Sequence, residues 1–305
     1  MSLSIILATR GRPAVLAETI RRTMENVALD LTRMVVVVDD DDQKTKDAIE
    51  ALDEDDTRVR YRVQPRALSL GEKYNSGLSV APADVYLVMV DYAPHVTPGF
   101  DQKILDAASI YSDGYAVVYN RNANLSFPGI NAVTRKMVAA MGGIYPALYP
   151  YWFVDHHLDD IAEITGRIVF ADVAIDTSTR DSHLVQTKTN WTQGMRETWF
   201  WALLFDACAG ERHEIARNII MAEDFEETAD RKRALINNIP RIAYHSQLVN
   251  SNARQMLGDD RSSDEWYAQV RANGMDKLRS IASVATMRQV EQVEKQYPIG
   301  IGVAA

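Results

Sequence analysis

Acidic side chains stand at the ends of two apolar segments of this chain. Asp39 to Asp42 close the run at residues 34–38, MVVVV, and Asp91 follows residues 85–90, VYLVMV. Short, continuous apolar runs of this kind are typical of central parallel strands that are covered on both faces. In open α/β sheets, ligands bind at the carboxyl ends of such strands. The spacing therefore predicts that these carboxylates meet a ligand at one edge of a sheet.

The four consecutive aspartates also have a simpler interpretation, as a solvated acidic turn. Their position after a buried strand favours a ligand-binding role, because a carboxylate there can accept hydrogen bonds from a ligand. The run is not a calcium-binding loop, since the glycine and the distal glutamate of that motif are missing at the required spacing.

Asp155 lies in a second region that could support chemistry. It follows the aromatic residues Tyr149, Tyr151, Trp152 and Phe153, which suit the face of a sugar or a base. Asp155 also begins a helical pattern at residues 155–165, where an aspartate can cap the first turn. A capping role and a catalytic role are compatible.

Alternating strands and helices must position these residues. Strands are predicted at 3–8, 34–38, 58–63, 85–90, 115–119, 168–171 and 173–175, and helices at 16–27, 44–52, 70–80, 100–110 and 155–165. This alternation predicts an α/β architecture with a mostly parallel sheet flanked by helices. In the run 58–63, Val59, Tyr61 and Val63 are expected to share one face.

The character of the chain changes from Trp191 onward, where helical patterns replace the strands. Helices are predicted near Gln193–Ala209, Glu211–Asn238, Ser263–Asn273 and Asp276–Tyr297. We therefore expect two regions, an α/β domain at 1–185 and an all-helical region at 186–305. The helical region carries no motif that assigns it a function, and a homo-oligomer formed through it is an open alternative.

Composition narrows the class of protein. The chain has 305 residues and a formal net charge of -9, so it lacks the general basic footprint of a nucleic-acid-binding protein, although a local basic patch is compatible with this charge. The single cysteine, Cys208, excludes an internal disulfide and a cysteine-based zinc site. No apolar run approaches the roughly 20 residues of a membrane span. The chain begins directly with a strand, so we expect no signal peptide and a cytoplasmic location.

The motifs together resemble those of family-2 glycosyltransferases, which have the GT-A fold. That family shows a helix with a basic residue and Asn-x-Gly, then Ala-x-Asp, an apolar strand, Asp-x-Asp and a proline. The corresponding residues here are Lys73, Asn75, Asp84, Asp91 and Pro98. The resemblance covers about the first 185 residues. It implies a Rossmann-like, mostly parallel sheet that binds a nucleotide sugar.

The resemblance also implies roles for single residues. In the family, the loop after the first strand and the carboxylate after the second strand hold the nucleoside. The donor-binding residues expected from the resemblance and from their charge are Thr9, Arg10, Asp39, Asp40, Arg66, Lys73 and Asn75. Asp155 is followed by Leu158 and Gly166 at the family's spacing, which implies that it is the general base of an inverting transfer.

Two positions depart from the family pattern. Ala93 replaces the second Asp of Asp-x-Asp, which usually holds the metal, and Val154 replaces a glutamate. We expect a divalent metal, Mn²⁺ or Mg²⁺, held by Asp91 together with His183, or with His95. The alternative is that basic side chains face the diphosphate directly, and the candidates are Arg10, Arg66, Lys73 and Arg180.

The expected activity is transfer of a sugar from a nucleoside diphosphate sugar, expected to be UDP-linked, to an acceptor hydroxyl with inversion. The acceptor class is open between a glycan, a small molecule and a modified nucleic acid. Two other functions are also open. Ala93 and Val154 suit a non-catalytic protein that binds sugar nucleotides or acts as a scaffold. A nucleotidyltransferase would share the nucleotide-binding half, but usually has a glycine-rich loop where this chain has only Gly11.

Overall fold

The structure is a computed structural model that describes residues 1–53, 57–120, 131–178, 198–242 and 265–296. The described residues form a seven-stranded sheet of order β3-β2-β1-β4-β6-β5-β7. Its strands are β1 Leu3–Ala8, β2 Arg33–Asp39, β3 Val59–Gln64, β4 Val85–Val90, β5 Val117–Asn120, β6 Asn131–Thr134 and β7 Ile168–Ala171. Among these strands β6 alone runs against the others, and the remaining pairs are parallel. The predicted mostly parallel α/β architecture is confirmed.

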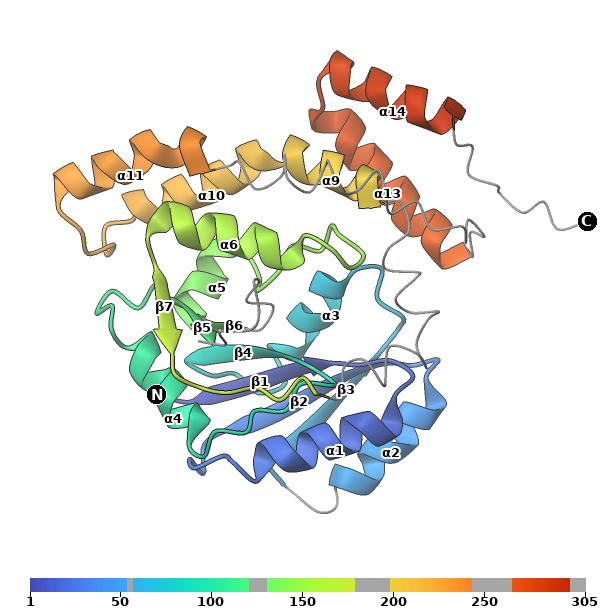
Figure 1. The fold of residues 1–305 in the computed structure, drawn as a ribbon, viewed down its shortest axis with the longest axis vertical. Coiled ribbons are helices and arrows are strands. Elements are labelled where there is room, and N and C mark those ends of the chain that lie inside the picture. Colours follow the sequence, from blue (N-terminus) through green and yellow to red (C-terminus); the bar gives the residue numbers. More distant parts are fainter. Residues whose placement is uncertain (54–56, 121–130, 179–197, 243–264, 297–305) are drawn as a thin grey trace, which may run out of the picture.

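Helices cover both faces of the sheet (Figure 1). One face carries α1 Pro13–Met24, α2 Gln43–Asp53 and α4 Phe100–Ala108; the other carries α3 Leu70–Gly77, α5 Arg135–Met141 and α6 Val154–Thr165. Successive residues of β1 therefore enter different cores: Ile5 and Leu7 pack in one hydrophobic cluster and Ile6 in the other. Burial on both faces explains why the central strands are apolar at nearly every position.

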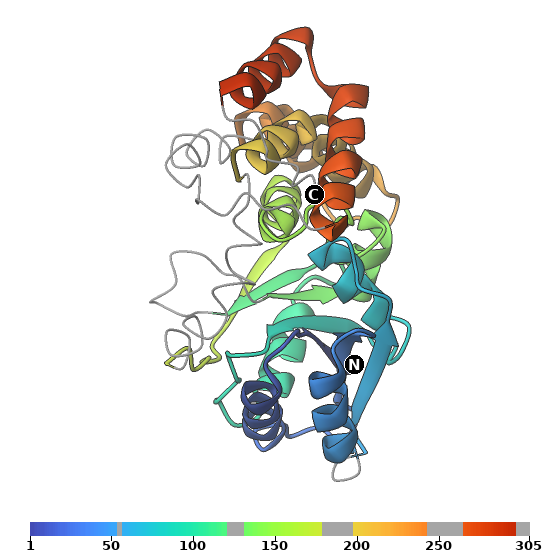
Figure 2. The ribbon, with the colours of Figure 1, turned by 90° about the vertical axis from the view of Figure 1, so that its right-hand side faces the viewer.

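The C-terminal helices form a further layer over α6, as Figures 1 and 2 show. They are α9 Thr198–Ala207, α10 Ala209–Met221, α11 Ala229–Ile242, α13 Glu265–Ile281 and α14 Val284–Gln296. The predicted helical region is confirmed, and its apolar residues share one continuous core with α3, α5 and α6. The predicted boundary at 185/186 lies outside the described residues. Among the helices described, none has both the length and the apolar character needed to cross a bilayer.

The predicted single helix at 211–238 is wrong, because residues 222–228 separate α10 from α11. These residues pack back against the α/β part of the chain instead. Asp224 pairs with Lys136 at 2.7 Å, and Glu227 pairs with Arg167 at 3.0 Å. Arg167 is buried, so it needs acidic partners, and the acidic loop between α10 and α11 provides one of them.

Two strand predictions also need correction. Val173–Ile175 is not a strand of the sheet; Ile175 makes one isolated bridge to His95, and the segment bonds to the loop after β4. In β3, Val59 is buried, but Tyr61 is 38% and Val63 is 40% exposed. Because β3 is an edge strand of the sheet, the shared face predicted for these three residues is not a core face.

Gly274 allows α13 to approach α9 closely, although the sequence pattern predicted a helix break near this position. A Cβ atom at 274 would lie 2.6 Å and 2.8 Å from two ring carbons of Trp201, which is buried beside Phe200. We predict that Gly274→Ala lowers the free energy of unfolding by about 1–3 kcal/mol, because overpacking forces buried rings to shift. Chemical denaturation measures this effect.

Gly210 provides the control, because it is also a helical glycine and a Cβ built there meets no atom within 4 Å apart from its chain neighbours and its own helix backbone. Gly210→Ala should be neutral or should stabilise the protein by up to about 1 kcal/mol through helix propensity. Equal effects of the two substitutions would contradict the packing argument.

Candidate functional site

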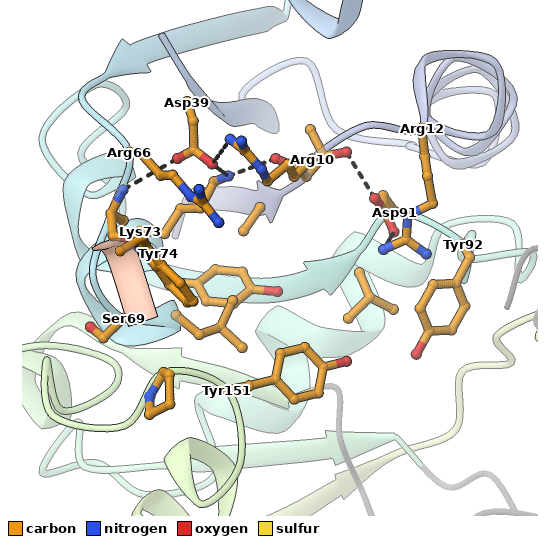
Figure 3. A pocket seen from close by; sticks show the side chains of 17 residues that line it. Arg10, Arg12, Asp39, Arg66, Ser69, Lys73, Tyr74, Asp91, Tyr92 and Tyr151 are labelled. Carbon is orange, nitrogen blue, oxygen red and sulfur yellow. Dashed lines mark hydrogen bonds and ion pairs between the residues drawn. The ribbon is translucent and has the colours of Figure 1, made fainter. Parts of the chain in front are cut away.

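A cavity of about 180 Å³ lies at the carboxyl ends of β1, β2 and β4 (Figure 3). Its walls come from the β1 loop, the end of β2, α3, the loop after β4, the segment before α6 and the start of α13. The lining residues are Ala8, Thr9, Arg10, Arg12, Asp39, Arg66, Ala67, Ser69, Leu70, Lys73, Tyr74, Val90, Asp91, Tyr92, Pro150, Tyr151 and Trp266. The predicted ligand-binding edge of the sheet is therefore hollow.

Asp39 occupies one end of this cavity and is only 3% exposed. Lys73 Nζ and Arg10 Nη1 each lie 2.9 Å from Asp39 Oδ2, and the Ala67 N–H donates to Oδ1 at 3.4 Å. Lys73 Nζ also donates to the Thr9 carbonyl at 2.6 Å. Burial lowers the pKa of Lys73, and the charge of Asp39 opposes this shift. The buried pair joins the β1 loop, β2 and α3 at one point.

The following aspartates brace the β1 loop. Asp41 bonds both terminal nitrogens of Arg10, at 2.5 and 2.8 Å, and Asp42 accepts from the Gly11 N–H at 2.6 Å. The hydrogen bond from Arg10 lowers the pKa of Asp41. Arg10 is therefore shared between Asp39 and Asp41, and its guanidinium is held at the cavity.

Asp91 occupies the opposite end of the cavity and is 1% exposed. Thr9 Oγ1 donates to its Oδ2 at 2.8 Å, and Arg12 Nη2 lies 2.8 Å from its Oδ1. Burial raises the pKa of Asp91, whereas the charge of Arg12 and the Thr9 hydrogen bond oppose the shift. The Arg12 guanidinium also lies over the Tyr92 ring, at 5.4 Å from its centroid. Both carboxylate oxygens of Asp91 thus have a partner.

Asp155 lies in the first turn of α6 and does not line the cavity. The alternative that Asp155 is the N-cap is wrong; the N-cap is Phe153, which has φ 75. A positive φ is unusual for a bulky residue and is stored strain. Asp155 Oδ1 accepts from the His156 N–H at 2.9 Å and lies 3.0 Å from His156 Nδ1. Burial alone would lower the pKa of His156, but its bond to Asp155 and the charges of Asp155, Asp159 and Asp160 raise it.

Tyr151 lines the cavity and also lies within the electrostatic influence of Asp155. Of the four aromatic residues that precede Asp155, it is the one that lines the cavity, whereas Tyr149 and Phe153 are core residues. The pKa of Tyr151 is raised to about 12, mainly by desolvation and also by the neighbouring Tyr92, Asp91 and Asp155, whereas Arg12 opposes the shift. The Tyr151 hydroxyl therefore lies within the fields of both carboxylates.

Two of the predicted donor-binding residues do not line the cavity. Asp40 is exposed, and its backbone N–H bonds Gln64. Asn75 instead holds the segment after α5: its amide donates to the Tyr145 carbonyl at 2.8 Å, and its Oδ1 accepts from the Ile144 N–H at 2.8 Å. The structure does bring together the other five, which are Thr9, Arg10, Asp39, Arg66 and Lys73.

The described residues do not fit a metal site. Among them, no three His, Cys, Asp or Glu side chains are grouped to hold an ion. Asp91 is already engaged by Thr9 and Arg12. His95 is fully buried, stacks on Phe100 and lies 3.3 Å from the Asn120 amide; burial lowers the pKa of His95 to about 3. The other predicted ligand, His183, lies outside the described residues, as does Arg180.

Arg12 and Trp266 are among the lining residues that were not predicted from the sequence. Arg12 stands next to the N1 proline of α1, and only its spacing from Thr9 in the β1 loop could have marked it. Trp266 comes from α13, far along the chain from the other lining residues, and no local pattern indicates it.

Residues 4–133 match the model of the glycosyl transferase family 2. The match spans β1 to β6 and confirms the resemblance over that part of the chain. The chain matches no curated protein sequence.

Solved structures that resemble the chain include the following two. One is mannosyltransferase PcManGT from Pyrobaculum calidifontis in complex with GDP-Man and Mn²⁺, with 11% identity, coverage of 97% of this chain and 87% of that chain, and a TM-score of 0.48. The other is S. aureus TarS 1-349, with 14% identity, coverage of 88% and 92%, and a TM-score of 0.49.

Proposed function

We propose that this chain transfers a sugar from a nucleoside diphosphate sugar to an acceptor hydroxyl, with inversion at the anomeric carbon. The proposed donor is a UDP-linked sugar. The match to glycosyl transferase family 2 supports glycosyl transfer. The observation that carries the proposal is the cavity itself, which has an acidic end at Asp39, a second carboxylate at Asp91, and basic side chains between and around them. Such a cavity suits a ligand that donates hydrogen bonds to the carboxylate at one end and carries negative charge where it passes the basic side chains.

The nucleoside belongs at the Asp39 end. One oxygen of Asp39 accepts only a long 3.4 Å bond from Ala67, so it can take a hydrogen bond from a ribose hydroxyl or a base N–H. Lys73 and Arg10 hold the carboxylate in place. The diphosphate then extends toward Asp91, where Arg12 is the nearest cation.

A divalent ion at Asp91 would need His183, water and phosphate oxygens as further ligands, and it would supply positive charge for the leaving diphosphate. Because Arg12 already bonds Asp91, we assign that charge to Arg12 with Lys73 and Arg10. A guanidinium suits phosphate oxygens, with which it can form paired hydrogen bonds. Stabilisation of charge that develops on the leaving group is commonly the largest single contribution to catalysis.

Asp155 is the residue proposed to accept the proton. The acceptor hydroxyl oxygen attacks the anomeric carbon, the bond from that carbon to the phosphate oxygen breaks, and the nucleoside diphosphate leaves with the electron pair. The hydroxyl proton passes to the Asp155 carboxylate. Asp155 is close enough to the lining residue Tyr151 to influence its pKa, and His156 bonds the Asp155 carboxylate.

Asp39→Ala tests the nucleoside assignment, with Asp40→Ala as its matched control. We predict that Asp39→Ala weakens UDP binding by about fivefold or more, the size of one lost hydrogen bond, in a calorimetric titration. Asp40→Ala should leave the affinity unchanged, because this neighbouring aspartate does not line the cavity. A panel of UDP, GDP, CDP and ADP identifies the preferred base. Equal effects of the two substitutions on UDP binding would contradict the proposed contact between Asp39 and the nucleoside.

Asp155→Asn tests the catalytic base. The amide keeps the shape of the carboxylate and can still accept from the His156 N–H, so the protein should fold and bind UDP normally. Turnover should fall by about a hundredfold or more, which is the usual contribution of a positioned base. Release of the nucleoside diphosphate from a nucleotide sugar reports turnover. Normal turnover by folded Asp155→Asn would rule out Asp155 as the catalytic base. If the unaltered protein binds the donor but shows no turnover, the alternative of a non-catalytic sugar-nucleotide-binding protein is favoured.

Arg12 and EDTA test the source of positive charge. We predict that the unaltered protein binds UDP equally well in excess EDTA, and that Arg12→Ala weakens UDP binding by about tenfold or more, as expected for a lost charge-assisted contact. Binding of uridine, which has no phosphate, should not change. Since Arg12→Ala leaves Asp91 buried and unpaired, the double variant Arg12→Ala/Asp91→Asn provides the same test without that charge. If UDP binding is lost in EDTA, a metal ion and not Arg12 supplies the positive charge that faces the diphosphate.

A further inference from the structure

Trp266 brings the C-terminal helical region into the cavity. It is the second residue of α13 and lines the same cavity as Thr9, Asp39 and Lys73. Its indole Nε1 donates to the Ala67 carbonyl at 2.9 Å, across 199 positions of sequence. The Arg66 guanidinium lies over its ring, at 4.5 Å from the centroid.

This contact lies next to Asp39. Ala67 bonds Asp39 through its N–H and Trp266 through its carbonyl, so one residue of the chain separates the carboxylate from the indole. An aromatic ring and a guanidinium provide flat surfaces on which a base can stack, and a neighbouring carboxylate provides the acceptor for the sugar hydroxyls. The three groups therefore provide complementary contacts for a nucleoside.

The far half of α13 is anchored, which fixes the position of Trp266. Gly274 lets the helix press against Trp201 and Phe200 of α9, and the Arg271 guanidinium lies 3.5 Å from the Phe200 ring centroid. Val270 and Leu278 are buried in the same core. A side chain carried by a packed helix needs little further ordering when a ligand binds, so more of the contact energy appears as affinity.

We propose that the base of the donor nucleotide packs against the Arg66–Trp266 pair, so that the helical region completes the nucleoside-binding end of the cavity. This inference rests on the proposed function and assigns a role to α13. It makes Trp266 a residue that determines affinity for the nucleoside rather than for the diphosphate.

Three probes separate the two ends of the ligand: UDP, uridine and inorganic pyrophosphate. Trp266→Ala should weaken the binding of UDP and of uridine by a similar factor, about tenfold, the usual loss for one base–aromatic stack, while pyrophosphate binding is unchanged. Arg12→Ala should give the reverse pattern. If the panel shows that another nucleoside diphosphate binds more tightly, it and its nucleoside replace UDP and uridine.

Trp266→Phe is the second variant, because it keeps an aromatic ring and removes the Nε1 donor. It should keep most of the affinity for UDP. The quenching of intrinsic tryptophan fluorescence that UDP causes in the unaltered protein should decrease strongly in Trp266→Phe, which a purely structural role for Trp266 would not produce.

The outcomes distinguish this inference from the proposed function. If the unaltered protein binds no nucleoside diphosphate, both are overturned. If the unaltered protein binds UDP, and folded Trp266→Ala binds UDP and uridine as tightly as the unaltered protein does, only the role of Trp266 is overturned. An equal loss of uridine and pyrophosphate binding in Trp266→Ala would also overturn it, because the effect would then not be specific for the base.

Discussion

A buried carboxylate needs a nearby cation, and this requirement determines the arrangement of the ligand-binding edge of the sheet. Asp39 and Asp91 are almost completely buried at the ends of β2 and β4, where an unpaired charge would cost several kcal/mol. Lys73 of α3 pairs with the first, and Arg12 of the β1 loop pairs with the second. Thr9 joins the two pairs, because its carbonyl accepts from Lys73 and its hydroxyl donates to Asp91. The β1 loop and α3 can therefore take only positions in which both pairs form.

The side chains that line the cavity are basic in sum, although the protein is acidic overall. The chain has a formal net charge of -9. Its cavity, however, is lined by four basic side chains, Arg10, Arg12, Arg66 and Lys73, and by two carboxylates, which leaves two positive charges in excess. Local excess of one sign in a concave site raises the concentration of oppositely charged ligands there. Net charge describes the chain as a whole, so it could not show where the cations gather.

Local sequence patterns predicted every strand of the sheet except β6, and they predicted the acidic residues at the ends of β2 and β4. The apolar runs at 34–38 and 85–90 identify β2 and β4, and parallel strands deliver their carboxyl ends to one edge, so Asp39 and Asp91 were predictable as neighbours. Contacts between distant elements were not predictable. Trp266 reaches Ala67 across 199 positions, and the break between α10 and α11 depends on the buried Arg167. The low helix propensity of glycine predicted a helix end at Gly274, but this residue lies inside α13. A local rule contains no information about the Trp201 ring that packs against it.

Ala93 stands where the resemblance to family-2 glycosyltransferases places the second aspartate of the acidic motif. Ala93 is fully buried and belongs to the core cluster of the face that α1 and α4 cover, together with Leu16 and Phe100. A carboxylate at this position would lie against the apolar side chains of that cluster, where an unpaired charge is costly. Restoring an aspartate at 93 would also leave both oxygens of Asp91 bonded to Thr9 and Arg12. The described structure thus places a positive charge of the chain itself, that of Arg12, beside Asp91.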